Sequence, residues 1–291
     1  MSYKKKGDTM TIKQAIERGV AKLKLEKITT PKLKVRLLMQ YVLEKPRQYL
    51  IIYDNEPLTR QQEDKFFDGI SKLSKDIPIE HITHKKEFMK LDFFVDENVL
   101  IPRQDTEILV EEVIEIAKKI NAKKILDLCT GSGAIAISLA KYLPNTQMTA
   151  LDISSKALEV AKLNAKTNNV ESQITFVESN LLENLPKEKY DIIVSNPPYI
   201  KQDIIKELDR EVQKEPHIAL DGGKDGLDFY RKIIDSGYEY LKYGGYLCLE
   251  IGYDQKEEVM NLLDNNGQYI NKICIKDLYD NDRVIIAKVG D

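Results

Sequence analysis

The tetrapeptide Asn-Pro-Pro-Tyr at residues 196–199 holds the residue types best suited to chemistry on a planar amino group. Prolines have no N–H, so the backbone there presents carbonyls, and the Asn196 side chain adds another acceptor. Two acceptors can take both hydrogens of an NH2 group while an aromatic ring packs on its plane. This turns the lone pair of a poorly nucleophilic amide nitrogen toward an electrophile. The predicted substrate-binding residues are Asn196, Pro197, Pro198 and Tyr199, and the catalytic ones among them are Asn196, Pro197 and Tyr199. A simple turn after a strand is the plainer alternative, since Asn-Pro dipeptides mark turns.

A second set of residues is typical of a site for a nucleotide-like cofactor. A buried strand at residues 125–128 leads into Gly131-Ser132-Gly133 and then into a helix. Glycines there let the backbone approach a ligand closely. Asp152 follows the next strand, about 20 residues later, where a carboxylate can bind both ribose hydroxyls. The full dinucleotide fingerprint is absent because residue 129 is Cys and residue 136 is Ala. An incidental strand–turn–helix is the alternative.

Alternating strands and helices must position both sets at one edge of a parallel sheet. The predicted strands cover residues 125–128, 147–151, 173–177, 191–194, 246–251, 269–275 and 283–289, and the predicted helices between them cover 135–142, 155–166, 227–242 and 256–263. A further helix runs to about Ile120, with Asp105 or Thr106 as its N-cap. Repeated strand–helix units with right-handed crossovers predict a doubly wound sheet.

The first part of the chain has a different pattern. Apolar residues at helical spacing predict helices from Thr11, from Pro31 with Thr30 as N-cap, and over residues 58–73. Residues 86–101 predict a hairpin or an extended connector. Residues 1–85 carry a net charge of +7, from 18 Lys and Arg against 11 Asp and Glu, whereas the rest carries −10. A basic domain followed by an acidic one suggests that the two domains have different functions, although ordinary solvated helix faces would also explain the difference in charge.

Bulk properties exclude several classes of protein. With 291 residues, 42% hydrophobic and 31% charged, the chain is expected to be globular and long enough for two domains. No apolar run approaches the roughly 18 residues that span a membrane, and we expect no signal peptide. Three dispersed cysteines indicate neither a disulfide framework nor a zinc site, so we expect a cytoplasmic protein without a metal.

Taken together, these motifs resemble the bacterial peptide-chain release factor glutamine N5-methyltransferases. The loop at 127–133 with Asp152 is similar to motifs I and II of class I S-adenosylmethionine-dependent methyltransferases. The likeness extends from about residue 10 to the end of the chain. The other stretches that carry it are residues 78–83, 100–107, 196–200, 215–227 and 276–284.

The resemblance implies an α/β fold with a doubly wound, seven-stranded class I methyltransferase sheet, a small N-terminal helical bundle and a short β-hairpin connector. From the residue patterns we predict a disordered tail (residues 1–10), a helical substrate-docking domain (11–85), the connector (86–101) and a methyltransferase domain (102–291). The cofactor-binding residues that the resemblance implies are Cys129, Thr130, Gly131, Ser132, Gly133, Asp152, Asn180, Leu181 and Asn196. Cys129 stands where the family usually has Gly, and Asn180 where it usually has Asp.

The implied reaction moves the methyl group of S-adenosylmethionine to the side-chain amide of the glutamine in the Gly-Gly-Gln motif of class 1 release factors. The product of the cofactor is S-adenosylhomocysteine. We expect a monomer that binds no nucleic acid and no membrane. Two rivals remain: a DNA adenine N6-methyltransferase, which uses the same tetrapeptide on a flipped base, and a non-catalytic module that binds translation factors.

Overall fold

The computed structural model describes residues 9–183, 185 and 188–290. The chain divides into two compact units. Unit 1 contains Met1–His84 and Arg210–Lys214, and unit 2 contains Lys85–Asp209 and Glu215–Asp291. Within the described residues, no helix is both long and apolar enough to cross a membrane.

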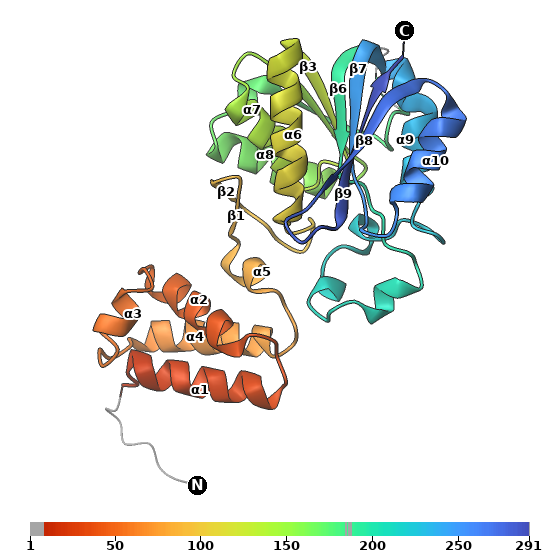
Figure 1. Ribbon diagram of the computed structural model, residues 1–291. Helices are drawn as coiled ribbons and strands as arrows, with labels where there is room; N and C mark the ends of the chain where they lie inside the picture. Colours follow the sequence, from red (N-terminus) through yellow and green to blue (C-terminus); the bar gives the residue numbers. More distant parts are fainter. Residues whose placement is uncertain (1–8, 184, 186–187, 291) are drawn as a thin grey trace. The chain divides into compact units, whose positions relative to one another are not determined.

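Unit 1 is a small helical bundle (Figure 1). Its helices are α1 (Ile12–Leu25), α2 (Pro31–Leu43), α3 (Tyr49–Ile52), α4 (Arg60–Leu73) and α5 (Ile79–Thr83), with a 3₁₀ turn at Val212–Lys214. Capping boxes start α1 and α4, because Thr11 and Thr59 each exchange hydrogen bonds with a glutamine three residues later. The bundle buries Leu23, Leu38 and Phe66 completely.

Three details of unit 1 differ from the sequence-based prediction. Met10, assigned to a tail, is buried, and its carbonyl accepts a hydrogen bond from the Leu58 N–H at 2.8 Å. The rest of that tail, residues 1–8, lies outside the described residues. Thr30 precedes α2 as predicted, but it has a φ of 47° and its side chain makes no capping bond. Helices α3 and α5 were missed because they are too short to show a helical period.

Unit 2 is built on a seven-stranded sheet in the order β5-β4-β3-β6-β7-β9-β8. Five neighbouring strands are parallel, and β9 runs antiparallel to both β7 and β8. The strands are β3 (Lys124–Leu128), β4 (Gln147–Asp152), β5 (Ile174–Glu178), β6 (Tyr190–Ser195), β7 (Leu241–Glu250), β8 (Tyr269–Lys276) and β9 (Asp282–Val289). The predicted doubly wound, seven-stranded sheet is therefore confirmed.

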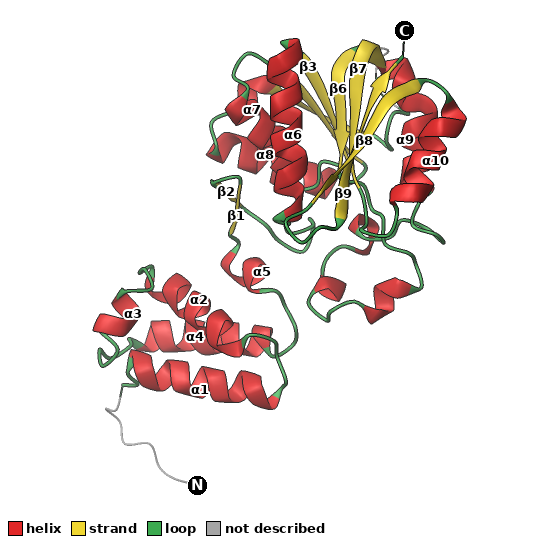
Figure 2. Cartoon of the chain, viewed as in Figure 1, coloured by secondary structure: helices red, strands yellow, loops and turns green. Residues whose placement is uncertain are grey.

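Helices cover both faces of this sheet (Figure 2). They are α6 (Asp105–Ile120), α7 (Ala134–Tyr142), α8 (Ser155–Thr167), α9 (Asp228–Gly237) and α10 (Lys256–Asn266), with 3₁₀ turns at Glu171–Gln173, Ile204–Glu207, His217–Ala219 and Tyr238–Tyr240. Successive strand residues alternate between the faces. Ile125 packs with α6 and α7, whereas Leu126 joins the core that includes Tyr230 of α9 and Leu263 of α10.

Two element boundaries in unit 2 differ most from the prediction. Helix α9 ends at Gly237, whereas the sequence predicted a helix to residue 242. Strand β7 starts at Leu241 rather than Tyr246 and passes through Gly244 and Gly245, where its pairing with β6 is irregular. Glycines weaken a strand signal, so sequence periodicity did not reveal this part of the strand. The predicted hairpin is present as β1 (Lys86–Phe88) paired with β2 (Leu91–Phe93).

Phe66 lies on α4, and its side chain is completely buried in the core of the bundle, so it should stabilise unit 1. We expect Phe66→Ala to lower the free energy of unfolding of unit 1 by about 3–5 kcal/mol. Amide hydrogen exchange in α1, α2 and α4 would measure this. Phe67→Ala is the matched control, because this neighbouring ring is only half-buried. An equal loss in the control would show that Phe66 has no special role.

Candidate active site

The site lies where the parallel strands of unit 2 end. From β3 the chain winds outward in one direction through β4 and β5, and in the other through β6 and β7. Ligands of such sheets bind outside the carboxyl ends of the strands, where the winding direction changes. The loops after β3 and β6 begin at Cys129 and Asn196, so the fold places both predicted motifs at this point.

A cavity in unit 2 opens at these strand ends. Its predicted lining residues are Cys129, Gly131, Asp152, Asn180, Leu181, Asn196 and Pro198. Sequence reasoning missed its other lining residues, which are Asn98, Val99, Leu100, Ile153, Ser154, Ala157, Ser179, Pro216, Ile218, Ala219 and Phe229. Most of these are apolar residues without a chemical motif, and only the fold brings them together. Ile153 and Ser154 directly follow Asp152, and this position is the only feature of the sequence that could have indicated them.

The glycine loop is held in shape by its own polar contacts. The Thr130 hydroxyl donates to the Asp127 carboxylate at 2.6 Å, and the Gly131 N–H donates to Asp152 Oδ2 at 2.8 Å. Gly131 has a φ of 55°, and a Cβ there would meet nothing within 4 Å. Its conformation, rather than crowding by protein atoms, requires glycine. Cys129 adopts a φ of 59° without that freedom.

Three predicted cofactor-binding residues are not among those lining the cavity: Thr130, Ser132 and Gly133. Thr130 and Ser132 are buried. A Cβ on Gly133 would lie 2.7 Å from Ile137 Cδ1 and 3.2 Å from Ala161 Cβ. Gly133 therefore permits the close packing of α7 against α8, so its place in the structure is at a helix contact.

Asp152 presents a half-buried carboxylate to the cavity at the end of β4. Its oxygens accept N–H groups from Gly131 at 2.8 Å and Ser154 at 2.9 Å. Burial raises the pKa of Asp152, while these hydrogen bonds oppose the rise. Each carboxylate oxygen has a second lone pair, so the group keeps the capacity to accept two hydroxyl groups.

Asn180 and Leu181 lie on the loop after β5 and line the same cavity. The Asn180 side-chain nitrogen donates to Glu183 Oε1 at 2.7 Å. This bond directs the amide so that its oxygen remains an acceptor. Leu181 is buried, with a φ of 50°. A carbonyl acceptor beside an apolar side chain suits the amino group and the ring of an adenine.

The Asn-Pro-Pro-Tyr loop is held from outside by the segment 220–226. Ile200 pairs with Asp221 in a parallel bridge, in which the Ile200 N–H donates to the Leu220 carbonyl at 3.0 Å. A Cβ on Gly222 would lie 2.7 Å from Tyr199 Cα, and one on Gly226 would lie 2.5 Å from the Tyr199 carbonyl oxygen. Only glycines allow this approach, so they fix the position of the loop.

Asn196 is held through its side chain by Thr106. Its Nδ2 donates to Thr106 Oγ1 at 3.1 Å. The sequence predicted that Asp105 or Thr106 caps α6, but that prediction is wrong. Gln104 occupies the capping position without a side-chain bond, and Thr106 lies within the first turn. Its hydroxyl binds Asn196 instead, because the loop after β6 lies within reach.

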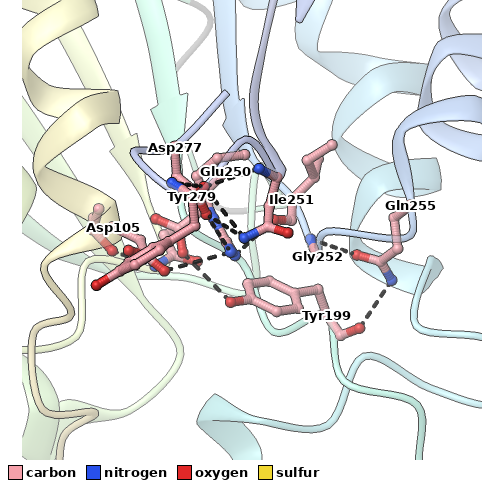
Figure 3. Close-up of polar contacts among 12 residues, drawn as sticks. Asp105, Tyr199, Glu250, Ile251, Gly252, Gln255, Asp277 and Tyr279 are labelled. Atoms are coloured by element: carbon pink, nitrogen blue, oxygen red, sulfur yellow. Dashed lines mark hydrogen bonds and ion pairs between the residues drawn. The ribbon is translucent and has the colours of Figure 1, made fainter. Parts of the chain in front are cut away.

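Tyr199 faces a buried carboxyl group on the neighbouring strand. Its hydroxyl donates a weak, 3.5 Å hydrogen bond to Oε1 of Glu250 at the end of β7 (Figure 3). Its carbonyl accepts from Gln255 Nε2 at 3.0 Å, and Gln255 Oε1 accepts from the Gly252 N–H at 2.9 Å. Burial raises the pKa of the Tyr199 hydroxyl, so it remains a neutral donor. Tyr199 is thereby held both at its hydroxyl and at its backbone carbonyl.

An ionic cluster anchors the start of α6 to the β8–β9 hairpin (Figure 3). Arg283 lies 3.4 Å from Asp105 and 3.1 Å from Asp277, and it also donates to the Ile251 carbonyl. Burial would raise the pKa of Asp277, but hydrogen bonds from Asn281 and Arg283 outweigh it and lower the pKa to about 2. Asp277 is therefore ionised at neutral pH, and the cluster helps to fix the helix turn that carries Thr106.

A second ion pair supports the rim of the cavity. The Glu215 side chain is almost fully buried and pairs with Arg103 at 2.5 Å, while its other oxygen accepts the Ile101 N–H at 2.8 Å. Glu215 precedes the lining residue Pro216, and Ile101 follows Leu100. The pair thus joins two stretches of the lining that lie far apart in the sequence.

The residues present fit S-adenosylmethionine. The Asp152 carboxylate, which suits ribose hydroxyls, the Asn180 carbonyl, which suits an adenine amino group, and Asn196 all line one cavity. Within the described part of the chain, no three His, Cys, Asp or Glu side chains are grouped to hold a metal ion. Burial raises the pKa of the Cys129 thiol, which disfavours a reactive thiolate beside the cofactor.

Comparison with known proteins identifies the parts of the chain. Residues 104–276 match the family Methyltransferase small domain, and residues 14–83 match the PrmC N-terminal domain. The structure is similar to the catalytic domain of hMettl16, solved in complex with MAT2A 3'UTR hairpin 6. That match has a TM-score of 0.56 at 16% identity and covers 70% of this chain and 77% of the other. At this identity the match shows the fold alone.

Sequence relatives are much closer. The chain is 45% identical to the release factor glutamine methyltransferase of Clostridium acetobutylicum, over 88% of this chain and 90% of the relative. It is 40% identical to the enzyme of the same name from Clostridium botulinum, over 96% of this chain and 99% of the relative. The matches extend over both units, and the chain therefore belongs to the release factor glutamine methyltransferase family of S-adenosylmethionine-dependent enzymes.

Proposed function

We propose that this enzyme transfers a methyl group from S-adenosylmethionine to the side-chain amide nitrogen (N5) of the glutamine in the Gly-Gly-Gln motif of class 1 peptide-chain release factors. Family membership supports the substrate class, because the relatives carry that name. The observation that carries the proposal is the placement of Asn196. Its amide nitrogen is bonded to Thr106, so its oxygen is left to accept a hydrogen, and it lines the same cavity as Asp152.

In the proposed reaction the protein acts by holding two groups in line. The bound cofactor supplies an electrophilic methyl group on a sulfonium. Asn196 Oδ1 and the Pro197 carbonyl accept the two hydrogens of the glutamine amide, and the Tyr199 ring packs on its plane. These contacts turn the nitrogen lone pair toward the methyl group. Orientation of this kind accounts for a large share of the lowering of the activation barrier by enzymes.

The proton balance of the reaction needs no dedicated base. The nitrogen forms a bond to the methyl carbon as the carbon–sulfur bond breaks, and the alkylated amide is strongly acidic. It loses its proton to water. The proposed work of the site is therefore positioning and exclusion of bulk water. Because no Lewis acid is required, the proposal includes no metal.

Asp152, Asn180 and the backbone of the loop at residues 129–133 are proposed to bind the cofactor. The wider proposal is a cytoplasmic enzyme that acts as a monomer and binds neither nucleic acid nor membrane. It rests on the absence of any apolar membrane-length run in the sequence and on a site whose proposed residues all come from unit 2 of one chain.

Unit 1 is proposed to dock the release factor. A Gly-Gly-Gln target offers far less than the roughly 1,200 Å² of a stable interface, so selection of one protein needs contacts elsewhere. The N-terminal residues carry the excess of Lys and Arg. On α2, exposed Lys32 and Arg36 alternate with exposed Leu33 and Leu37. Such a basic and apolar face suits an acidic protein surface, and the charges would speed encounter.

Asp152→Ala should weaken S-adenosylmethionine binding tenfold or more. Hydrogen bonds to a charged group contribute roughly 1.5–3 kcal/mol each, and the variant loses the acceptor for two hydroxyls. Isothermal titration calorimetry measures the change. Glu178→Ala is the control, because Glu178 ends the adjacent strand in register with Asp152 but is exposed and outside the cavity lining. Unchanged affinity in Asp152→Ala would assign the ribose to another residue.

Asn196→Ala should lower turnover on the order of a hundredfold, because misplacement of a reacting group by about 1 Å has an effect of that size. Affinity for the cofactor should change much less. The assay offers labelled S-adenosylmethionine with release factor, ribosomal proteins and DNA in parallel, and only release factor should take the label. Gln202→Ala, which removes an exposed amide from the same segment, should keep normal turnover. Near-normal turnover in Asn196→Ala would remove Asn196 from the mechanism, and label on DNA would favour the rival function.

Charge reversal on α2 tests the docking role. Lys32→Glu with Arg36→Glu should lower kcat/KM for whole release factor about tenfold at low salt, with little effect on a short Gly-Gly-Gln peptide. The loss should shrink near 1 M salt, where the Debye length falls to about 3 Å. Lys34 is unsuitable, because it is buried and paired with Glu211 within unit 1.

Arg60→Glu with Lys75→Glu is the control for this charge reversal. Arg60 is the first residue of α4, Lys75 lies just after its end, and both are exposed. This variant should lower kcat/KM for whole release factor less than the α2 variant does. Two results would contradict docking through α2. One is equal methylation of peptide and protein by the unmodified enzyme, and the other is an equal effect of both charge reversals.

A further inference from the structure

Thr106 lies between the proposed substrate-binding amide and a buried carboxyl group. Its Oγ1 accepts a hydrogen bond from Asn196 Nδ2 at 3.1 Å. Its hydroxyl also contacts the Glu250 carboxyl, and this contact lowers the pKa of Glu250. The three residues come from α6, from the loop after β6 and from the end of β7, so the fold alone brings them together.

The number of hydrogens fixes the direction of these bonds. A hydroxyl has one hydrogen to donate and two lone pairs. Since Thr106 accepts from Asn196, its hydrogen is available to the Glu250 carboxylate, which can only accept. Glu250 also accepts from the Tyr199 hydroxyl at 3.5 Å. Tyr199 thus bonds Glu250 directly, and Asn196 can be linked to the same acceptor through Thr106.

We propose that Thr106 and Glu250 are positioning residues that set which end of the Asn196 amide faces the substrate. This inference rests on the proposed function, in which Asn196 Oδ1 accepts a hydrogen of the target amide. The Glu250 carboxylate accepts the Thr106 hydrogen, the Thr106 oxygen then accepts from Asn196 Nδ2, and Asn196 Oδ1 is left facing the site. Neither Thr106 nor Glu250 need touch the reacting atoms.

A device of this kind is needed because packing cannot orient an asparagine amide. The oxygen and the NH2 group have nearly the same size and shape, so the two orientations differ only in their hydrogen bonds. The reversed amide would point an NH2 group at the NH2 group of the substrate. Two donors would then face each other, and the target nitrogen would lose its orientation.

Glu250 directs these bonds only while it is ionised, because the protonated acid is itself a donor. It is 1% exposed, and its Oε2 has no hydrogen-bond partner within the described residues. Burial raises the pKa of Glu250 to about 7; Thr106 and Arg283 oppose the rise, Asp105 adds to it, and Tyr199 opposes it. The other titratable group against it is Tyr230, whose hydroxyl donates to the Glu250 backbone carbonyl at 2.9 Å.

The pH dependence follows from the sign of that shift. With its pKa raised to about 7, Glu250 becomes protonated as the pH falls through that value. Turnover should therefore fall on the acidic side of about pH 7 and be complete above it. The amide of the substrate does not titrate in this range, but burial also raises the pKa of Asp127 to about 7. The contribution of Glu250 is therefore the part of the acidic limb in kcat that Glu250→Gln removes.

The first test removes or keeps the Thr106 hydroxyl. Thr106→Val is isosteric and should lower kcat at least tenfold, while Thr106→Ser should restore most of it. Affinity for S-adenosylmethionine and the melting temperature should stay near the wild-type values in Thr106→Ser. Thr146→Val is the matched control, because Thr146 is equally buried and donates to the Ala122 carbonyl outside the cavity lining. It should share any stability loss without the loss of kcat.

The second test replaces the acceptor. Glu250→Gln keeps the volume but adds a donor and cannot ionise. Its kcat should fall about tenfold, and the acidic limb near pH 7 should become weaker, because only the contribution of Asp127 is left. If the limb is unchanged in Glu250→Gln, or if Thr106→Val keeps wild-type kcat, the proposed positioning role is overturned.

Failure of this inference is distinct from failure of the proposed function. Wild-type kcat in Thr106→Val together with an inactive Asn196→Ala removes only the positioning role. Wild-type kcat in both variants removes the role of Asn196 as well. A loss of kcat in Thr106→Val that Thr146→Val reproduces would be a structural effect and would also overturn the positioning role.

Discussion

A loop with two consecutive prolines cannot hold itself in place, and much of the site is arranged around that constraint. Pro197 and Pro198 have no N–H, so this part of the loop forms no ladder of its own. It is fixed instead by neighbours on both sides. The 220–226 segment bridges to Ile200, and Gln255 bonds the Tyr199 carbonyl. The glycines at 222 and 226 are required because the two backbones nearly touch. The loop that contains these prolines thus depends on a rigid support from other parts of unit 2.

Buried carboxyl groups recur at the ends of the parallel strands. Asp127, Asp152 and Glu250 lie on β3, β4 and β7, and burial raises the pKa of each. Asp127 and Glu250 each have a raised pKa of about 7 and keep one oxygen without a partner among the described residues. Such groups are costly to bury, and they concentrate at functional sites. Of the three, Asp152 lines the cavity, and the negative charge of its carboxylate is complementary to the positive charge of a sulfonium cofactor.

The two motifs that the sequence displays have different structural duties. In the glycine loop, only part of the predicted set reaches the cavity, while Thr130 bonds Asp127 and Gly133 permits helix packing. In the tetrapeptide loop, Tyr199 is tied to Glu250 by its hydroxyl. A motif therefore indicates where the site lies rather than which residues line it. Some of its residues line the cavity, and others hold the loop in its conformation.

The sequence by itself predicted most of the elements and indicated where the site lies. Helical and strand periods are local, so they predicted most of the sheet, and Asn196 and Asp152 stood out as chemistry at strand ends. Tertiary structure alone decided the partners. Thr106 looked like a helix cap, yet it bonds Asn196, 90 residues away. Lys34 counts toward the basic charge of the N-terminal residues, but it is buried and paired with Glu211 in unit 1. Glu250 showed no signal, because it only completes a strand pattern. Pairings between distant residues depend on packing that no local period records, which is why the fold had to reveal them.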